Sequence, residues 1–371
     1  MKKIPLIRPK IDEKDLRVAL KDIVKTGMLT KGKYLHAFEE KLAQILGKKY
    51  AYGVTSCTTA LHLALVAGGI KTGDEVLVSD FSFPATGNVV VHIGAKPIFV
   101  DIDSKTFCMD PEDLEKKITK KSKAIIVVHA FGFPAPMEKI VKIAKKHKLL
   151  LIEDAACAIG TKYKGKYLGS FGDLGCFSFH PRKVVTTGEG GAIVTDSKEI
   201  AQKIEILKNH GSVVTDKGLS FIEAGYNYRL SEIQAAMGLP QLENLSKIIK
   251  NRQKVARKLI KLLSKIPGLV LPDEPKDIDF NFQSFVITLP EKTGRNKIIK
   301  MMRQNNIETT IGTYALHREP AYKQYGYHPG DLKNSDYAYH HTLTLPLFED
   351  LTDRELSLIA ETLKDTLSDL K

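Results

Sequence analysis

The stretch CFSFHPRKVVTTGEGGAIVT, residues 176–195, contains a lysine, Lys183, among side chains that favour burial. Aromatic residues precede it, and Val184 and Val185 follow it, which is not the pattern of a solvent-exposed helix. Because an unpaired ammonium group is costly to bury, such a lysine must be paired, neutralised or used chemically. A lysine whose amine becomes an imine no longer carries an unpaired buried charge. Lys183 is therefore a candidate nucleophile.

An acidic pair ends another apolar run. In LLLIED, Glu153 and Asp154 follow four apolar residues that are typical of a buried strand. Successive side chains of a strand point to opposite faces, so only one of the two carboxylates can face a site at the strand end. The alternative role for the aspartate is that of an ordinary helix N-cap.

Three further segments supply groups that could bind a ligand. SCTT, with Cys57 and Thr58, follows a predicted strand and opens a predicted helix, whose N-terminal N–H groups and hydroxyls can bind an anion. Ordinary capping explains the same pattern. FSFPAT offers Phe81 and Phe83, one of which could stack on a flat ring, although phenylalanine more often fills a core. SFHPRK adds Ser178 next to the lysine.

Together these groups fit one ligand, pyridoxal phosphate. Its protonated ring nitrogen would pair with an acid, a helix start would hold its phosphate, an aromatic residue would cover its ring, and a lysine would form an imine with its aldehyde. Alternative chemistries have less support, because the sequence has no HExxH metal motif and no GxSxG nucleophile elbow. GEGG is not a GxGxxG fingerprint, and it more plausibly forms a tight turn.

The elements that must position these groups alternate from about residue 50. Short apolar strands are followed by helical stretches, which predicts an α/β fold with a mostly parallel sheet and ligands at the carboxyl ends of the strands. We expect a large domain over residues 14–245 and a smaller C-terminal α+β domain over 246–371. Residues 1–13 are expected to pack with the small domain or with a partner subunit. A long helix is expected over 230–264, interrupted near Gly238–Pro240.

Composition narrows the functional class. The 371 residues carry a formal net charge of +13, but the lysines recur within helical runs and are typical of solvated helix faces. No nucleic-acid-binding signature accompanies them, and a basic surface would also suit a phosphate-bearing small substrate. No apolar run is long enough to cross a membrane. The four cysteines, Cys57, Cys108, Cys157 and Cys176, show no disulfide framework, so we expect a cytoplasmic protein with free thiols.

Several motifs in this order resemble the nucleotide-sugar aminotransferases of the DegT/DnrJ/EryC1/StrS family, within the fold-type I group of pyridoxal-phosphate enzymes. The resemblance covers most of the chain. It extends from GMLTKGKYLHAFEEKLAQILGKKYA through GDEVLVSDFSFPAT, EDAA, GSFGDLGCFSFHPRKVVTTGEGGAIVT and AGYNYRLSEIQAAMGLPQL to LTLPLFEDLT. It implies a three-layer α/β/α large domain and a small C-terminal α+β domain.

The resemblance also implies roles for individual residues. Lys183 would be the Schiff-base lysine, and Asp154 would pair with the pyridinium nitrogen. Phe83 and Ala156 would cover the two faces of the cofactor ring, and Cys157 would lie near the ring hydroxyl. The phosphate would be held by the backbone of Cys57, by Thr58 and by Ser178. Asn227 of a second subunit would also reach the phosphate. The sites would then be shared across a homodimer. Cys57 replaces a common glycine, and Cys157 replaces a common glutamine or histidine.

The implied reaction moves an amino group from an amino acid, with L-glutamate favoured, to a keto sugar of a nucleoside-diphosphate sugar, with C4 favoured over C3. Pyridoxamine 5'-phosphate would carry the amino group between the two half-reactions. Tyr314 and His317 are candidate sugar or nucleotide contacts, and ordinary loop residues are the equal alternative. Two other functions stay open: a sugar dehydratase of the same family, in which histidine replaces the lysine, and a non-catalytic regulatory or binding protein of the same fold.

Overall fold

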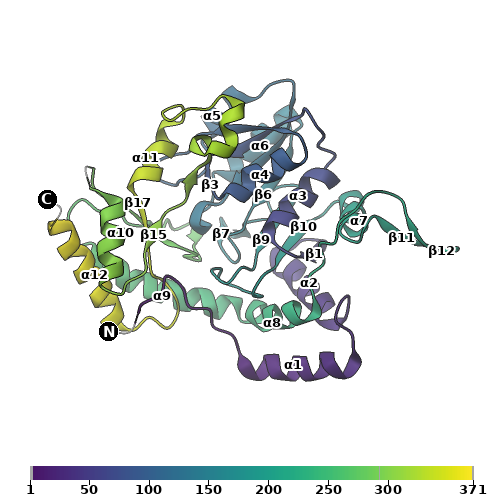
Figure 1. Ribbon diagram of the computed structural model, residues 1–371, viewed down its shortest axis with the longest axis horizontal. Helices are drawn as coiled ribbons and strands as arrows, with labels where there is room; N and C mark the ends of the chain where they lie inside the picture. The colour runs from purple at the N-terminus through teal and green to yellow at the C-terminus, as the bar shows by residue number, and fades with distance from the viewer. Residues whose placement is uncertain (1–2, 292, 370–371) are drawn as a thin grey trace.

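A seven-stranded sheet organises the large domain in the computed structural model, which describes residues 3–291 and 293–369 (Figure 1). β10 pairs antiparallel with both of its neighbours, and the other pairs are parallel, so the expected mostly parallel sheet is confirmed. The strand order is β1 (Tyr50–Val54), β10 (Gly191–Thr195), β9 (Leu174–Ser178), β6 (Leu150–Asp154), β5 (Ser122–Val128), β2 (Glu75–Ser79) and β4 (Lys96–Val100).

Helices cover both faces of this sheet and make the three layers. The strands are rich in valine, isoleucine and leucine because both of their faces are buried, as in β2, where all five residues are buried. One face packs on α3 (Cys57–Ala67), α4 (Pro84–His92) and α7 (Lys198–Leu207). The other packs on α2 (Lys33–Leu46), α5 (Pro111–Lys117), α6 (Met137–His147) and α8 (Glu232–Glu243). α1 (Glu13–Thr26) lies against α8.

The small domain has its own core and its own sheet. β17 lies between β14 and β15, and all three pack with α9, α10 and α12. These elements span Leu245–Leu263 (α9), Phe285–Thr288 (β14), Arg295–Gln304 (α10), Thr310–Ile311 (β15), Thr342–Leu345 (β17) and Asp353–Ser368 (α12). A capping box between Thr352 and Glu355 begins α12. The N-terminal segment packs on this domain, since Ile4 is buried in its core and bridges to Ile307.

The long helix is interrupted at Asn244, and not near Gly238–Pro240 as expected. Pro240 lies inside α8, and the backbone N–H of Asn244 donates to its carbonyl at 3.1 Å. The amide side chain of Asn244 donates to the same oxygen at 2.9 Å, and this local bonding ends the helix. Gly238 serves close packing, because a Cβ there would lie 2.6 Å from the Phe38 ring.

Residues 314–341 pack on elements of the large domain. β16 (Tyr314–Ala315) pairs with β3 (Phe81–Ser82), and Tyr322 is buried in the large-domain core. The other elements of this segment are η2 (Leu316–Arg318), η3 (Pro320–Tyr325) and α11 (Lys333–His341). The rest of the fold comprises η1 (Ala130–Gly132) and the short strands β7 (Lys162–Tyr163), β8 (Lys166–Tyr167) and β13 (Ile278–Asp279).

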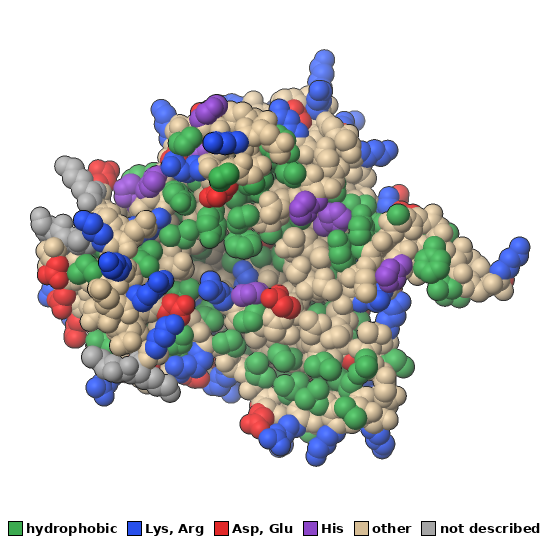
Figure 2. Space-filling view, viewed as in Figure 1, with side chains coloured by type: hydrophobic (Ala, Val, Ile, Leu, Met, Phe, Trp, Pro, Cys, Tyr) green, Lys and Arg blue, Asp and Glu red, His purple; other side chains and the backbone are tan. Residues whose placement is uncertain are grey.

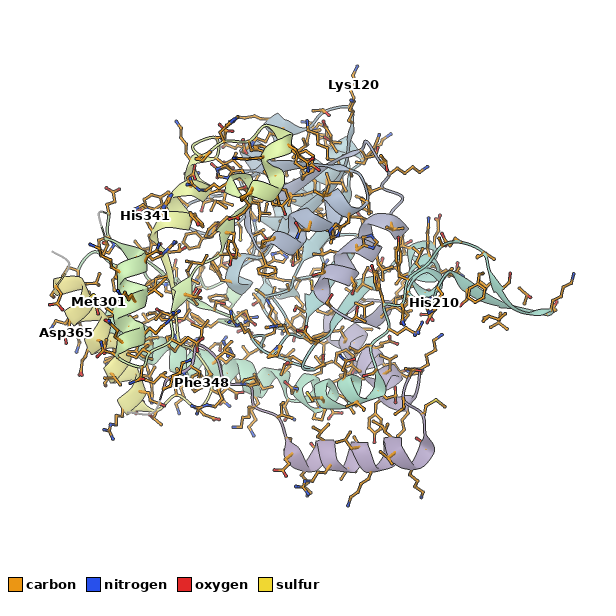
Figure 3. The ribbon with its side chains drawn as sticks, in the orientation of Figure 1. Lys120, His210, Met301, His341, Phe348 and Asp365 are labelled. Atoms are coloured by element: carbon orange, nitrogen blue, oxygen red, sulfur yellow. The ribbon has the colours of Figure 1, made fainter. Side chains whose placement is uncertain are left out.

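A hairpin projects from the body of the large domain. β11 (Ser212–Thr215) and β12 (Gly218–Phe221) extend outward beyond α7, with His210 at the base (Figures 1 and 3). Val214, Leu219 and Phe221 on this hairpin are exposed. A second group of hydrophobic side chains is visible over α1, α2 and α8 (Figure 2). Within the described residues, no helix is long and apolar enough to cross a membrane.

Candidate active site

The two carboxylates at the end of β6 point to opposite faces, as strand alternation requires. Asp154 accepts a hydrogen bond from the Thr86 hydroxyl at 2.8 Å and another from the Ala156 backbone N–H at 3.2 Å. Burial raises the pKa of Asp154 above its ordinary value, although these two hydrogen bonds act in the opposite direction. A buried carboxylate with so few donors favours a cationic ligand beside it.

Glu153 is fully buried on the other face and has a complete set of partners. It contacts the His129 ring at 2.9 Å and accepts backbone hydrogen bonds from Gly169 at 2.7 Å and Gly172 at 2.6 Å. Burial by itself would raise its pKa, but the hydrogen bonds from His129 and the two glycines hold the pKa of Glu153 below its ordinary value. Glu153 therefore stabilises the fold and has no capacity left for a ligand.

Lys183 lies in the turn that follows β9, with its amine directed toward the Asp154 side of the sheet. Its Nζ is 3.1 Å from the sulfur of Cys157. Burial opposes the charged form of the amine, but Cys157, more than Asp154, outweighs it and raises the pKa of Lys183 above its ordinary value. The residue as a whole is half-buried.

The start of α3 provides an anion site. Ser56 caps the helix through the backbone N–H of Thr59, and the N–H groups of Cys57 and Thr58 have no hydrogen-bond partner among the described residues. Gly191 lies so close that a Cβ there would be 2.5 Å from the Cys57 nitrogen. Ser178 pairs with Gly191 across the sheet, which brings Ser178 close to this end of the helix. Free donors at a helix N-terminus fit a phosphate group.

Phe83 provides an aromatic surface beside these groups. It precedes α4, and 64% of its side chain is exposed, which is unusual for a phenylalanine next to a core. Its ring is edge-on to that of Tyr314, with centroids 6.2 Å apart. Ala156 is half-buried and follows directly after the acidic pair. An acid, an amine, an anion site and an exposed ring are the set that pyridoxal phosphate requires, so the residues fit this cofactor.

The two residues that were candidates for substrate contact differ in position. Tyr314 is half-buried next to Phe83 at the edge of the site. His317 is buried, and its backbone N–H and its Nδ1 each lie 2.7 Å from the Asp80 carboxylate, with Asp336 at 3.4 Å from Nε2. This position favours the alternative of a structural role for His317.

Asn227 is exposed and makes no side-chain hydrogen bond to Thr58, Ser178 or Lys183 among the residues described. The flanking Tyr226 and Tyr228 stack on each other at 4.8 Å, nearly parallel, which anchors the segment. One chain by itself therefore does not bring Asn227 to the anion site.

The sequence analysis did not identify Thr86, which contacts Asp154, or Asp80, which contacts the neighbouring His317. Thr86 supplies a hydrogen bond to Asp154 from the first turn of α4, and its only signal was its place in FSFPAT. Asp80 follows β2 directly, a position like that of Asp154, and it holds the His317 segment.

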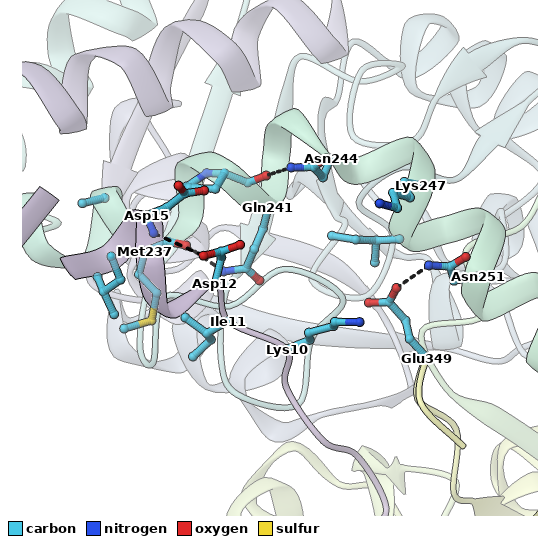
Figure 4. Close-up of a pocket in the computed structure, with 14 residues that line it drawn as sticks. Lys10, Ile11, Asp12, Asp15, Met237, Gln241, Asn244, Lys247, Asn251 and Glu349 are labelled. Atoms are coloured by element: carbon cyan, nitrogen blue, oxygen red, sulfur yellow. Dashed lines mark hydrogen bonds between the residues drawn. The ribbon is translucent and has the colours of Figure 1, made fainter. Parts of the chain in front are cut away.

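A separate cavity of about 310 Å³ lies between the N-terminal segment, α8, α9 and Glu349 (Figure 4). None of the candidate site residues lines it. Among the residues that the structure describes, no cluster of histidine, cysteine and acidic side chains could hold a metal ion.

Residues 10–364 match the family described as the DegT/DnrJ/EryC1/StrS aminotransferase family. The chain belongs to this family. GDP-perosamine synthase of Escherichia coli O157:H7 is 37% identical over 370 residues and covers 100% of both chains. The spore coat polysaccharide biosynthesis protein SpsC of Bacillus subtilis is 36% identical over 376 residues, which is 98% of this chain and 96% of SpsC.

A solved relative establishes the cofactor. The putative sugar aminotransferase Spr1654 from Streptococcus pneumoniae superimposes in its PLP form with a TM-score of 0.94 at 25% identity, covering 100% of both chains. It superimposes equally well in its PMP form, over 99% of this chain and 98% of its own. This family member is thus a PLP-dependent sugar aminotransferase of fold-type I, as the sequence predicted.

Proposed function

We propose that this aminotransferase transfers an amino group from L-glutamate to the C4 position of a keto sugar linked to a nucleoside diphosphate. The convergence of Lys183, Asp154 and the free N–H groups of α3 on one edge of the sheet carries the proposal. The similarity to GDP-perosamine synthase supports a nucleotide-linked sugar as the acceptor. The segments around Lys183 and Asn227 favour C4 over C3, because they resemble those of perosamine-synthase-like members.

Asp154, Thr86 and Lys183 would have distinct tasks in this mechanism. Bound pyridoxal phosphate supplies an aldehyde that exchanges with amines and a ring that takes up electrons. Asp154 holds a proton on the ring nitrogen by its charge, and Thr86 keeps the carboxylate oriented. Lys183 would hold the cofactor through its amine, and the same amine would move a proton at the donor's α-carbon.

The other contacts orient the ring. Cys57, Thr58 and Ser178 would bind the phosphate, and Phe83 and Ala156 would cover the two ring faces. Cys157 stands beside the amine of Lys183, where its thiol can approach the ring hydroxyl. A thiol donates only weakly, so this hydrogen bond is weaker than one from glutamine or histidine.

We also propose a homodimer with shared sites. Asn227 is exposed in one chain, and the nearby hairpin exposes Val214, Leu219 and Phe221, which a second copy would cover. Asn227 would then reach the phosphate of the partner's site. Mixing inactive Lys183→Ala subunits with inactive Asn227 variants should restore some activity if labelled chains exchange. Mixed dimers without activity would contradict the model of shared sites.

The four cysteines are free, which fits the reducing cytoplasm that we propose as the location of this protein.

The dehydratase and regulatory alternatives are both less well supported. A dehydratase would carry a histidine at the position of Lys183, and a regulator would not need the set of Asp154, Ser178 and Lys183. A mass-spectrometric screen of 3-keto and 4-keto nucleotide sugars with glutamate tests the proposal. We expect a 4-amino product and 2-oxoglutarate. A 3-amino product would overturn the C4 assignment, and a dehydrated product or none would favour the alternatives.

A further inference from the structure

Three consecutive residues, Asn281–Phe282–Gln283, contact both chain segments that carry the chemistry of the site. They lie between β13 and β14, where the chain enters the small-domain sheet. Asn281 and Gln283 are polar and almost fully buried, with 0% and 3% of their surface exposed. Buried amides are retained only where their hydrogen bonds are made, so their partners indicate what they position.

Gln283 holds the backbone on both sides of Lys183. Its Oε1 accepts from the Val184 N–H at 2.9 Å, and its Nε2 donates to the Arg182 carbonyl at 2.6 Å. The amide thus makes two backbone hydrogen bonds of the kind that a neighbouring strand would make in a sheet. Because both bonds flank Lys183, they restrict the backbone from which its amine projects.

Asn281 holds the opposite segment. Its Nδ2 donates to the carbonyls of Cys157 at 2.9 Å and Ile159 at 3.0 Å, and its Oδ1 accepts from the Gln283 N–H at 2.8 Å. Gly132 packs closely against this amide, since a Cβ there would lie 2.3 Å from that Oδ1. The two amides therefore set the separation between the Cys157 and Lys183 segments, whose side chains meet at 3.1 Å.

Arg252 ties this segment to α9. It is buried, and its Nη2 donates to the carbonyls of Phe282 at 2.6 Å and Gln283 at 3.1 Å. Phe282 adopts a left-handed backbone conformation, with φ of 48°, which costs free energy for a bulky residue and needs surrounding contacts to persist. A conformation held against strain is expected where precise position matters.

We propose that Gln283 is a positioning residue for Lys183, and that the 281–283 segment links the placement of the small domain to the catalytic amine. This inference rests on the proposed role of Lys183 as the lysine that carries the cofactor. Losing Gln283 should leave the cofactor phosphate site intact but make the amine less accurately placed for attack on the aldehyde, and misplacement of a reacting group slows a reaction steeply.

Gln241, in α8, offers a matched control because it contacts the same loop. It is also a buried glutamine, and it binds both backbone groups of one residue, accepting from the Thr186 N–H at 3.0 Å and donating to its carbonyl at 2.7 Å. Thr186 lies three residues after Lys183. Gln241→Met therefore removes the same kind of contact from the loop without touching the backbone next to the lysine.

The experiment compares Gln283→Met, Gln241→Met and Lys183→Ala in full-length, cofactor-free protein mixed with pyridoxal phosphate. Borohydride added at successive times fixes the cofactor that has reacted with lysine, and thermal unfolding reports stability. We expect both methionine variants to lose stability. We expect attachment to slow about tenfold in Gln283→Met, equivalent to about 1.4 kcal/mol of activation free energy, and less than about twofold in Gln241→Met.

Gln283→Glu adds a pH readout that a purely structural role would not produce. A neutral carboxyl group can accept from Val184 and donate to Arg182, as the amide does, but a carboxylate cannot donate. The attachment rate of Gln283→Glu relative to Gln283→Met should therefore be near one at pH 8 and rise as pH falls toward 5. If Gln283→Met does not fold, the attachment rate of Gln283→Glu is compared with that of wild type over the same pH range.

The outcomes separate the inference from the function on which it rests. Equal slowing of attachment in Gln283→Met and Gln241→Met would overturn the positioning role. The absence of a pH-dependent recovery in Gln283→Glu would do the same. Neither result would affect the proposed function as long as Lys183→Ala still abolishes attachment. Specific attachment that persists in Lys183→Ala would overturn the proposed function itself.

Discussion

The two faces of β6 carry adjacent carboxylates in opposite states. On one face, Glu153 has a histidine and two backbone donors, and its pKa is held below the ordinary value. On the other, Asp154 has a hydroxyl and one backbone donor, and burial raises its pKa. The same strand thus places one acid in a completed structural network and the next in a site where the charge of Lys183 only partly offsets the effect of burial on its pKa.

The Glu153 face of β6 therefore contributes to stability, and the Asp154 face contributes to the proposed site. A carboxylate with all its hydrogen bonds made favours the folded state, and a buried one whose charge is only partly offset opposes it until a ligand supplies further counter-charge. The two positions should therefore respond to neutral substitutions in opposite directions. Four predictions test this contrast, beginning with the largest effect.

Lys183→Ala should remove turnover by about four orders of magnitude, because both the attachment point and the proton-transferring amine are lost. The fold should persist, since the side chain is half-buried and its only side-chain hydrogen bond among the described residues is with Cys157. Steady-state rates with glutamate and circular dichroism check the two parts. Near wild-type turnover would show that another lysine does the chemistry.

Asp154→Asn should slow turnover by about a hundredfold or more, because a neutral amide cannot hold the ring proton by charge. In the cofactor-free protein the same change should raise the free energy of unfolding by about 1 kcal/mol at neutral pH. The raised pKa of Asp154 means that its contribution favours the fold below about pH 3.9 and is lost as pH rises through the folded-state pKa. Denaturant unfolding at pH 7 checks this, and destabilisation would refute it.

Glu153→Gln should lower the free energy of unfolding and leave turnover nearly unchanged. It leaves buried donors on Gly169 and Gly172 facing an amide, which should cost about 3 kcal/mol of stability at pH 7 with little change in turnover per folded molecule. Because the pKa of Glu153 is lowered, its stabilisation is present above about pH 4.3 and is lost as pH falls through the folded-state pKa. The stability gap to wild type should therefore shrink on acidification, and a constant gap would count against this assignment.

Thr86→Val tests the smallest effect. Removing its hydroxyl takes one hydrogen bond from Asp154, worth about 1 kcal/mol, so turnover should fall about fivefold. Thr86→Ser keeps the hydroxyl and serves as the control. If the serine and valine variants have equal rates, Thr86 does not orient the carboxylate.

The sequence predicted the parts of this molecule that depend on local patterns. Apolar strands alternating with helices indicated the sheet, and the polar residues after those strands indicated Asp154, Ser178 and Lys183. Alternation alone could not decide between Glu153 and Asp154, because that choice depends on which face carries His129. Gln283 is a hundred residues from Lys183, and no local pattern reveals a contact made only by tertiary folding.

Other features depended on context that a linear pattern does not contain. Pro240 was expected to interrupt the long helix, but the hydrogen bonds of Asn244 determine where it ends. His317 looked like an accessible loop residue, and its pairing with Asp80 buries it. The packing of residues 314–341 on the large domain is likewise a tertiary contact between distant segments.

The central claim is that Lys183 carries the cofactor, and covalent trapping tests it most directly. The full-length protein loaded with pyridoxal phosphate is reduced with borohydride, digested and mapped by mass spectrometry. We predict one modified lysine, in the peptide that contains Lys183, and loss of this modification when excess glutamate converts the cofactor to its amine form before reduction. A cofactor fixed to a different lysine, or no fixed cofactor in protein that binds it, would contradict the account.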